Sequence, residues 1–305
     1  MLAVIAQFFL AIVALLDKYI VSDEKIMPRP FVYAFYSCLI AGGWAIVFLL
    51  GLLPTSIPLP SFANVDKPSL ELVGLSVLSA YTFFIALVSM FTALKEADAS
   101  DVVPVVGAVS AIGTFGLGVL FLDVTLSSNF IWGIALLATG TLLASHFRFS
   151  AKVALLSVHS GVFFALHWVS VKGIFNISES FDNGFFWSRM GFVFIALSLL
   201  LVPTYWEKIR EQTKTTKAKA GYLVLGNKLM AGIATILLLK ATQIGDVAVI
   251  QALGGLQFVF LLLIGIFFGR LLPYSVGEND DPKDSAFQKA IFVSIIVLGF
   301  VMLFK

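Results

Sequence analysis

The sequence has little cysteine and little charge, and both shortages limit what the protein can be. The one cysteine, Cys38, lies within an apolar run, so there is no disulfide framework and no CxxC motif for a metal or redox centre. Charged residues make up only 12% of the 305 positions, and the net charge of +2 is too small to indicate a nucleic-acid-binding protein.

Motifs for common catalytic and nucleotide-binding sites are also missing. The chain contains no GxSxG, no HExxH and no Walker loop. We therefore expect no enzymatic activity, no cofactor and no metal site. Because a nucleotide-binding loop is lacking, the sequence also argues against a pump driven directly by ATP.

Apolar residues, in contrast, are abundant. They make up 59% of the chain, and the mean hydropathy is +1.00. A helix that crosses a membrane needs about 20 apolar residues. Ten windows meet this condition: 2–21, 31–53, 70–94, 102–122, 130–147, 153–171, 184–203, 220–239, 247–268 and 286–304. The links between them, including the basic stretch 204–220, are too short to form domains.

The amino-terminal segment is apolar from its start and has neither a basic n-region nor an A-x-A cleavage site. We interpret it as the first membrane helix and not as a removed signal peptide. The sequence therefore predicts an all-α integral membrane protein, multi-pass, in the cytoplasmic (plasma) membrane. Its expected partners are the lipid bilayer and a small-molecule substrate, and a homodimer is left open.

The two halves of the chain resemble each other in order. LKEADASDVV (94–103) matches LKATQIGDVA (239–248), FYSC (35–38) resembles FWSR (186–189), and Lys18 matches Lys172. Such ordered matches predict a duplication, with repeats at 1–147 and 148–305. Five helices per repeat is an odd number, so the second repeat enters the membrane from the opposite side. Inverted repeats are typical of alternating-access transporters.

The stretch ALKEADASDVVPVVGAVSAIGTFGLGVLFLDVTLSSNFIWGIALLATGTLLAS (93–145) resembles the EamA-like branch of the drug/metabolite transporter superfamily, and 287–304 keeps its outline. The resemblance covers nearly the whole chain. It implies a secondary transporter that moves a small metabolite by alternating access. The chain departs from the family where Asp123 replaces the usual Glu and where Arg270 stands at the equivalent place. Pro104 is matched by Val249 in the second half.

Polar side chains within the predicted helices are the candidate substrate-binding residues. Lys228 lies about 12 Å deep at 1.5 Å per residue, where an unpaired cation is costly, and Asn227 precedes it. Arg189 lies closer to a helix end and could extend to the interface. For Lys228 the alternatives are a substrate or coupling role and a pair with a structural acid; Asp17 and Lys18 are interpreted as a separate pair at the interface.

His159 and His167 lie about two turns apart on one helix, roughly on one face, and could bind an anion or relay protons. The alternative is that each bonds a neighbouring helix. Gln251 is a further candidate, beside Gly254 and Gly255, where helices could approach closely. Asp101 and Asp246 are predicted to be helix N-caps. The stripe of Ser110, Thr114 and Gly118 is interpreted as a packing surface.

Because the interior charge is cationic, the sequence favours an anionic or zwitterionic substrate, such as an amino acid. Two other hypotheses remain. A lipid-handling membrane protein would have a cleft that opens sideways to lipid, and a non-catalytic transporter subunit would need a partner.

Basic residues predict the orientation, because Lys and Arg concentrate in cytoplasmic loops. Of the 20 Lys and Arg residues, only Lys67, Lys172, Lys240 and Lys305 lie on the face that carries both predicted termini. Arg189 and Lys228 lie within helices, and the others lie at the opposite face. The count places both termini outside, whereas members of the family that the chain resembles usually have both in the cytoplasm.

The orientation is testable because the chain has one native cysteine. We expect a cysteine added after Lys305 of a Cys38→Ala variant to react with a membrane-impermeant maleimide in intact cells. Labelling that requires permeabilised cells would contradict the charge count.

Overall fold

The computed structural model describes residues 1–52, 60–122, 128–144, 150–178, 180–268, 291 and 294–302. These residues form helices and no strand. Asp123, Arg270, Lys305 and much of the predicted span 286–304 lie outside the described residues. The helices are α1 (Leu2–Ser22), α2 (Pro30–Gly43), η1 (Trp44–Ile46), α3 (Val47–Leu50), η2 (Phe62–Asn64), α4 (Leu70–Glu96), α5 (Ala99–Phe121), α6 (Ser128–Ala144), α7 (Ala151–Ile177), α8 (Phe181–Leu200), α9 (Pro203–Thr215), α10 (Ala218–Ile244), α11 (Val247–Ala252) and α12 (Gly255–Phe268).

Eight helical segments in the described part of the chain are long and apolar enough to cross a membrane. They correspond to eight of the ten predicted windows, so the structure has the pattern of a multi-pass helical membrane protein. The window 130–147 falls on α6, which is helical over 17 residues. In the window 286–304, the described residues 294–302 are helical.

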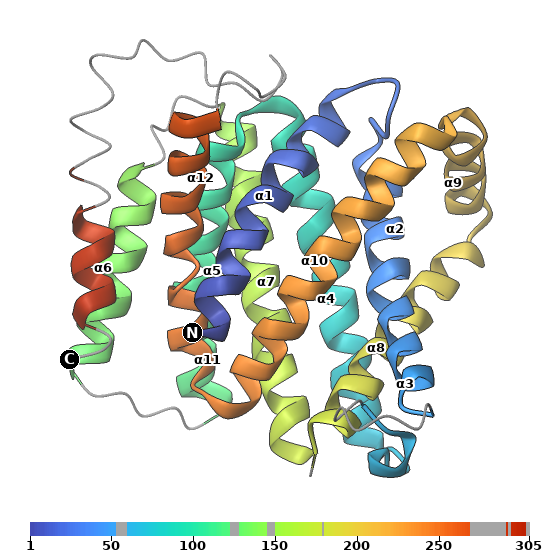
Figure 1. The fold of residues 1–305 in the computed structure, drawn as a ribbon, viewed down its shortest axis with the longest axis horizontal. Coiled ribbons are helices and arrows are strands. Elements are labelled where there is room, and N and C mark those ends of the chain that lie inside the picture. Colours follow the sequence, from blue (N-terminus) through green and yellow to red (C-terminus); the bar gives the residue numbers. More distant parts are fainter. Residues whose placement is uncertain are drawn as a thin grey trace.

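The long helices run along one common direction and alternate up and down (Figure 1). Helix α1 packs along α10, and α7 packs along α4 and α5. Between these groups α2 packs on α8, and α5 packs on α11. Each helix of the first half therefore contacts helices of the second half, and the core lies between the halves.

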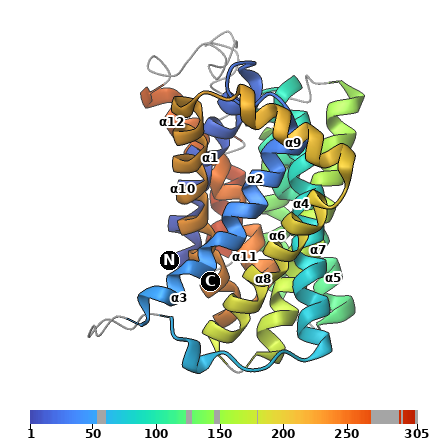
Figure 2. The ribbon, with the colours of Figure 1, turned by 90° about the vertical axis from the view of Figure 1, so that its right-hand side faces the viewer.

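The basic stretch 204–220, expected to be a link, forms helix α9 over most of its length. Pro203 begins α9, as its fixed φ favours at a first helical position. Ile209 is buried while most neighbouring side chains are exposed. The prediction missed α9 because this helix is polar and lies at one end of the bundle (Figure 2), where it needs no apolar run.

Two of the apolar spans are not regular α-helices. The span Pro30–Leu50 contains the 3-10 segment η1, and the span Val247–Gly265 is interrupted between α11 and α12 at Leu253 and Gly254. Across this second interruption, the N–H of Gly254 donates to the carbonyl of Gln251 at 2.9 Å, three residues back instead of four. A discontinuous membrane helix places backbone groups inside the bundle, where they can face a cavity.

Lysines tie the ends of two helices in equivalent ways. Lys18 Nζ donates to carbonyls at the end of α4, including that of Ala97 at 2.9 Å. Lys172 Nζ donates to carbonyls at the end of α10, including that of Thr242 at 3.0 Å. A lysine satisfies in this way carbonyls that a helix end leaves without partners. Ala97 and Thr242 occupy matching positions in the aligned stretches 94–103 and 239–248, and Lys18 and Lys172 also match.

The predicted N-caps have different outcomes. Asp246 caps α11 and accepts the backbone N–H of Ala248 at 2.8 Å, which confirms its prediction. For Asp101 the prediction was wrong: α5 begins at Ala99 with Asp98 as its N-cap, so Asp101 lies in the first turn. Ser110, Thr114 and Gly118 are all buried on α5.

A glycine allows α8 to approach α4 closely. A Cβ atom on Gly191 would lie 2.2 Å from the carbonyl oxygen of Ser76, which is backbone and cannot rotate away. By contrast, a Cβ on Gly226 of α10 would meet nothing within 4 Å. The crossing of α4 and α8 therefore depends on the absence of a side chain at position 191.

We expect Gly191→Ala to lower the free energy of unfolding by about 1–3 kcal/mol or more, because the helices must separate to admit the methyl group. Gly226→Ala is the control and should stabilise by up to about 1 kcal/mol, since alanine is the better helix former. Thermal unfolding in detergent, followed by tryptophan fluorescence, measures both. Equal melting temperatures for the two variants would contradict the close approach.

Candidate functional site

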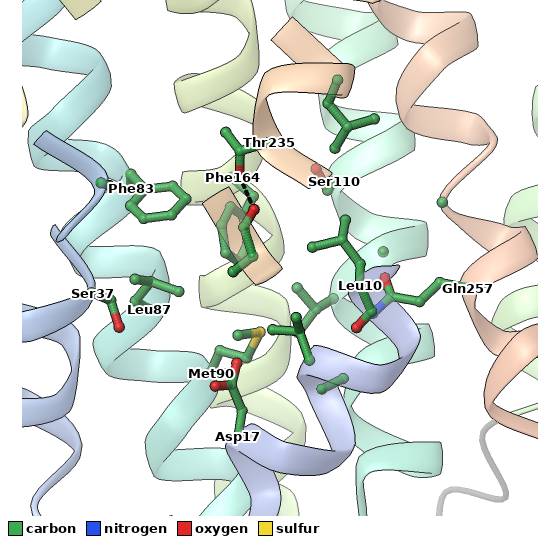
Figure 3. A pocket seen from close by; sticks show the side chains of 18 of the residues that line it. Leu10, Asp17, Ser37, Phe83, Leu87, Met90, Ser110, Phe164, Thr235 and Gln257 are labelled. Atoms are coloured by element: carbon green, nitrogen blue, oxygen red, sulfur yellow. Dashed lines mark hydrogen bonds between the residues drawn. The ribbon is translucent and has the colours of Figure 1, made fainter. Parts of the chain in front are cut away.

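A central cavity of about 190 Å³ has several polar side chains in its wall. Its walls come from α1, α2, α4 and α5 of the first half and from α7, α8, α10, α11 and α12 of the second. Figure 3 shows Asp17 near Met90 in one part of the cavity, and Gln257 beside Leu10 in another. Much of the wall is apolar, with a few polar groups, as is usual for a small-molecule site.

Lys228, the first candidate, pairs with an acid. Its Nζ lies 2.7 Å from Asp17 Oδ1, and both side chains are almost fully buried. The same oxygen accepts hydrogen bonds from Asn227 Nδ2 at 2.7 Å and from the hydroxyl of Tyr33. Lys228 Nζ also lies 4.2 Å from the centroid of the Tyr33 ring, in cation–π contact. Four side chains from α1, α2 and α10 thus form one buried network.

The prediction for Asp17 was wrong. The sequence suggested an interface pair with Lys18, but Asp17 is only 3% exposed and pairs with Lys228. The Nζ of Lys18 donates instead to the carbonyl of Leu94, near the end of α4. Adjacent residues on a helix point in directions about 100° apart, so they do not face each other.

Arg189 has no acidic partner among the residues that the structure describes. It is 2% exposed, so it does not extend to the interface, which was one alternative that the sequence left open. Its Nη1 and Nε make only long bonds of 3.4 Å, to the carbonyl of Ala41 and the hydroxyl of Ser188. Phe192 lies 4.7 Å from its Cζ, measured to the ring centroid. Within the described residues, Nη2 has no hydrogen-bond partner, although Arg189 lines the cavity.

The two histidine candidates do not line the cavity. His167 is buried, and its Nδ1 lies 2.9 Å from the hydroxyl of Ser79. His159 lies at the outer surface of α7, with its Nδ1 2.8 Å from the hydroxyl of Ser89. Both therefore bond α4, which is the alternative that the sequence left open.

Gln251 does line the cavity, and its Nε2 has no partner among the described residues. Three further lining residues carry a buried polar atom without a partner there, and the sequence did not single them out as ligand-binding: Gln7 Oε1, Trp44 Nε1 and Ser110 Oγ. Gly232 makes room for the Trp44 indole, since a Cβ there would lie 1.7 Å from Nε1. Buried groups of this kind are costly unless a ligand or water satisfies them.

No family model matches the chain, and no characterised protein matches it. Among solved structures, 29 chains match. One of them, described only as the crystal structure of a protein, superimposes with a TM-score of 0.64 over 98% of this chain and 93% of its own length. Its sequence identity is 17%, so the likeness shows the fold alone. The function must be argued from the cavity.

We expect Asp17→Asn and Lys228→Met each to lower the free energy of unfolding by about 3–5 kcal/mol, because each leaves a buried charge without its partner. The double variant should lose less than the sum of the two, because no lone charge remains. Thermal unfolding of all three proteins measures the coupling.

The exposed pair of Lys95 and Glu24, whose atoms lie 3.0 Å apart, serves as the control. Lys95→Met should cost about 1 kcal/mol or less. If the losses of Asp17→Asn and Lys228→Met simply add in the double variant, the two residues are not an energetic unit.

Proposed function

We propose that the protein is a secondary transporter of a small metabolite that carries a carboxylate, such as an amino acid, and that it works by alternating access. It would belong to the drug/metabolite transporter class that its sequence resembles. The observation that carries the proposal is the buried Arg189 guanidinium, which lines the cavity with Nη2 unpartnered in the described structure. Arginine binds carboxylates through paired, charge-assisted hydrogen bonds.

The charge of the cavity supports an anionic group on the substrate. Its described lining contains two cations, Arg189 and Lys228, and one acid, Asp17. Because Asp17 and Lys228 are bonded to each other, one positive charge is left to be balanced. Trp44 Nε1 adds a donor on the same wall, and donors are what a carboxylate requires.

The contacts between helices support two inverted five-helix repeats, and so ten spans with a moving interface between them. If α1 corresponds to α7 and α4 to α10, the packing of α1 on α10 is the counterpart of the packing of α7 on α4. The ties made by Lys18 and Lys172 obey the same correspondence. A cavity midway between inverted repeats is where secondary transporters hold substrate.

The size and position of the cavity favour a solute over a lipid. Pockets for drug-sized ligands measure about 300–1,000 Å³, and this one measures about 190 Å³. Its lining is drawn from both halves and not from one lateral gap between neighbouring helices. We therefore rank the lipid-handling hypothesis, and that of a subunit without its own transport site, below transport.

The test is ligand-induced stabilisation of the purified protein followed by uptake. We expect several L-amino acids or other small carboxylates to raise the melting temperature, since a ligand that binds the folded state stabilises it by mass action. The corresponding amides and amines, which lack the carboxylate, should not. A stabilising compound should then exchange across proteoliposomes in a counterflow assay.

Arg189→Gln should weaken binding of that compound by about tenfold to a hundredfold, because one charge-assisted contact is lost. Arg210→Gln, on the exposed face of α9, removes the same charge outside the cavity and should bind as the unaltered protein does. Equal affinity of the Arg189→Gln and Arg210→Gln variants, or stabilisation by the amides as strong as by the acids, would contradict the proposal.

A further inference from the structure

The interruption between α11 and α12 creates a second polar region in the cavity wall. Gln251 lies in the last turn of α11, before the break, and Gln257 lies in the first turn of α12. Gln7 of α1 lies against the same point, since a Cβ on Gly254 would be 4.0 Å from its Nε2. Gln257 Nε2 donates to the carbonyl of Leu10 at 3.0 Å and so holds α12 against α1.

Two of these three amides have a polar atom without a hydrogen-bond partner among the described residues. Gln7 is 3% exposed and its Oε1 is a buried acceptor without a partner in the described structure. Gln251 is 9% exposed and its Nε2 is a buried donor in the same situation. Both residues line the cavity. Together they offer one acceptor and one donor, with no net charge.

We infer that Gln7 and Gln251 form a subsite for an uncharged polar group of the ligand, a carboxamide or a hydroxyl. Such groups both donate and accept hydrogen bonds, so they can satisfy the two amides together. The inference rests on the proposed function, in which Arg189 binds the carboxylate of the same molecule. The ligand class is then a polar, uncharged amino acid and not an aliphatic one.

The expected preference for polar over apolar ligands follows from the amide atoms that an apolar group would leave without hydrogen bonds. An alkyl side chain of the same shape would fill the subsite and bury both amide atoms without a hydrogen bond. A site built to bond a polar group rejects its apolar isostere far more strongly than a plain apolar pocket distinguishes similar shapes. In this inference the break between α11 and α12 is an element of substrate specificity.

The experiment compares amino acids that match in shape. L-asparagine and L-leucine have side chains of the same branching, as do L-threonine and L-valine. Binding to the purified full chain is measured by thermal stabilisation over a concentration series. We expect the polar member of at least one pair to bind about tenfold or more tightly than its apolar isostere.

Three variants locate the preference. Gln7→Met and Gln251→Met keep the size of the side chain and remove the amide, and each should reduce the preference for the polar member. Gln243→Met changes a glutamine outside the cavity, at the end of α10, whose Oε1 accepts from Lys240. That control should leave the preference unchanged. The comparison in the unaltered protein stands even if a variant does not fold.

The outcomes separate this inference from the proposed function. If the acids stabilise the protein and depend on Arg189, but isosteres bind equally or the preference survives in both Gln7→Met and Gln251→Met, the subsite is overturned and the transport proposal is not. If none of the four amino acids stabilises the unaltered protein but another small carboxylate does so through Arg189, the subsite is overturned and the proposed function is not; if no carboxylate stabilises it, both are overturned. A preference for the polar member that is lost in either cavity variant and kept in Gln243→Met supports the inference.

Discussion

The cost of burying charge within a membrane-spanning bundle is the constraint that orders the interior of this protein. An ion far from water must find a partner or face a cavity. Lys228 meets the constraint with Asp17, whose carboxylate oxygen also accepts from Asn227 and Tyr33. Arg189 is as deeply buried, but its described neighbours supply two long hydrogen bonds and aromatic rings and no acid. The first cation joins helices of the two halves, and the second remains available to a ligand.

The scaffold around these charges is close to symmetric, and the site is not. Lys18 and Lys172 tie matching helix ends, and α1 on α10 mirrors α7 on α4. Arg189 and Lys228, however, belong to the second half. The helix that follows the contacts of Lys172 is interrupted between α11 and α12, whereas α5, which follows the contacts of Lys18, continues through Pro104. In the proposed function, these matching elements are the ones that two inverted halves would need in order to move against each other. The asymmetric ones lie at the cavity, where a substrate without symmetry would be recognised.

Much of the fold could be predicted from the sequence because a helix that crosses a membrane requires a long run of apolar residues. Eight of the ten windows correspond to described spans, while the polar helix α9 was missed because nothing in its composition separates it from a basic loop. The inferred duplication also relied on the match between Lys18 and Lys172. In the structure, the Nζ of each lysine donates hydrogen bonds to carbonyls at the end of a helix.

The candidate site could be predicted only in part. Lys228, Asn227, Arg189 and Gln251 were identified because polar residues stand out in apolar helices, and three of these four line the cavity. The sequence could not assign the partner of Lys228, because Asp17 is distant in the chain and lies beside Lys18, with which it was expected to pair. His159 and His167 share a helix face, but that face meets serines of α4 and not the cavity. Gln7 and Trp44 were passed over because their importance depends on what packs against them.

The role of Arg189 is tested most directly by a structure of the protein determined with a stabilising carboxylate bound. We expect ligand density in the central cavity, with a carboxylate oxygen within hydrogen-bond distance of Arg189 Nη2 while Lys228 stays paired with Asp17. Density that lies elsewhere, or an acidic side chain of the protein itself bonded to Arg189, would contradict this expectation.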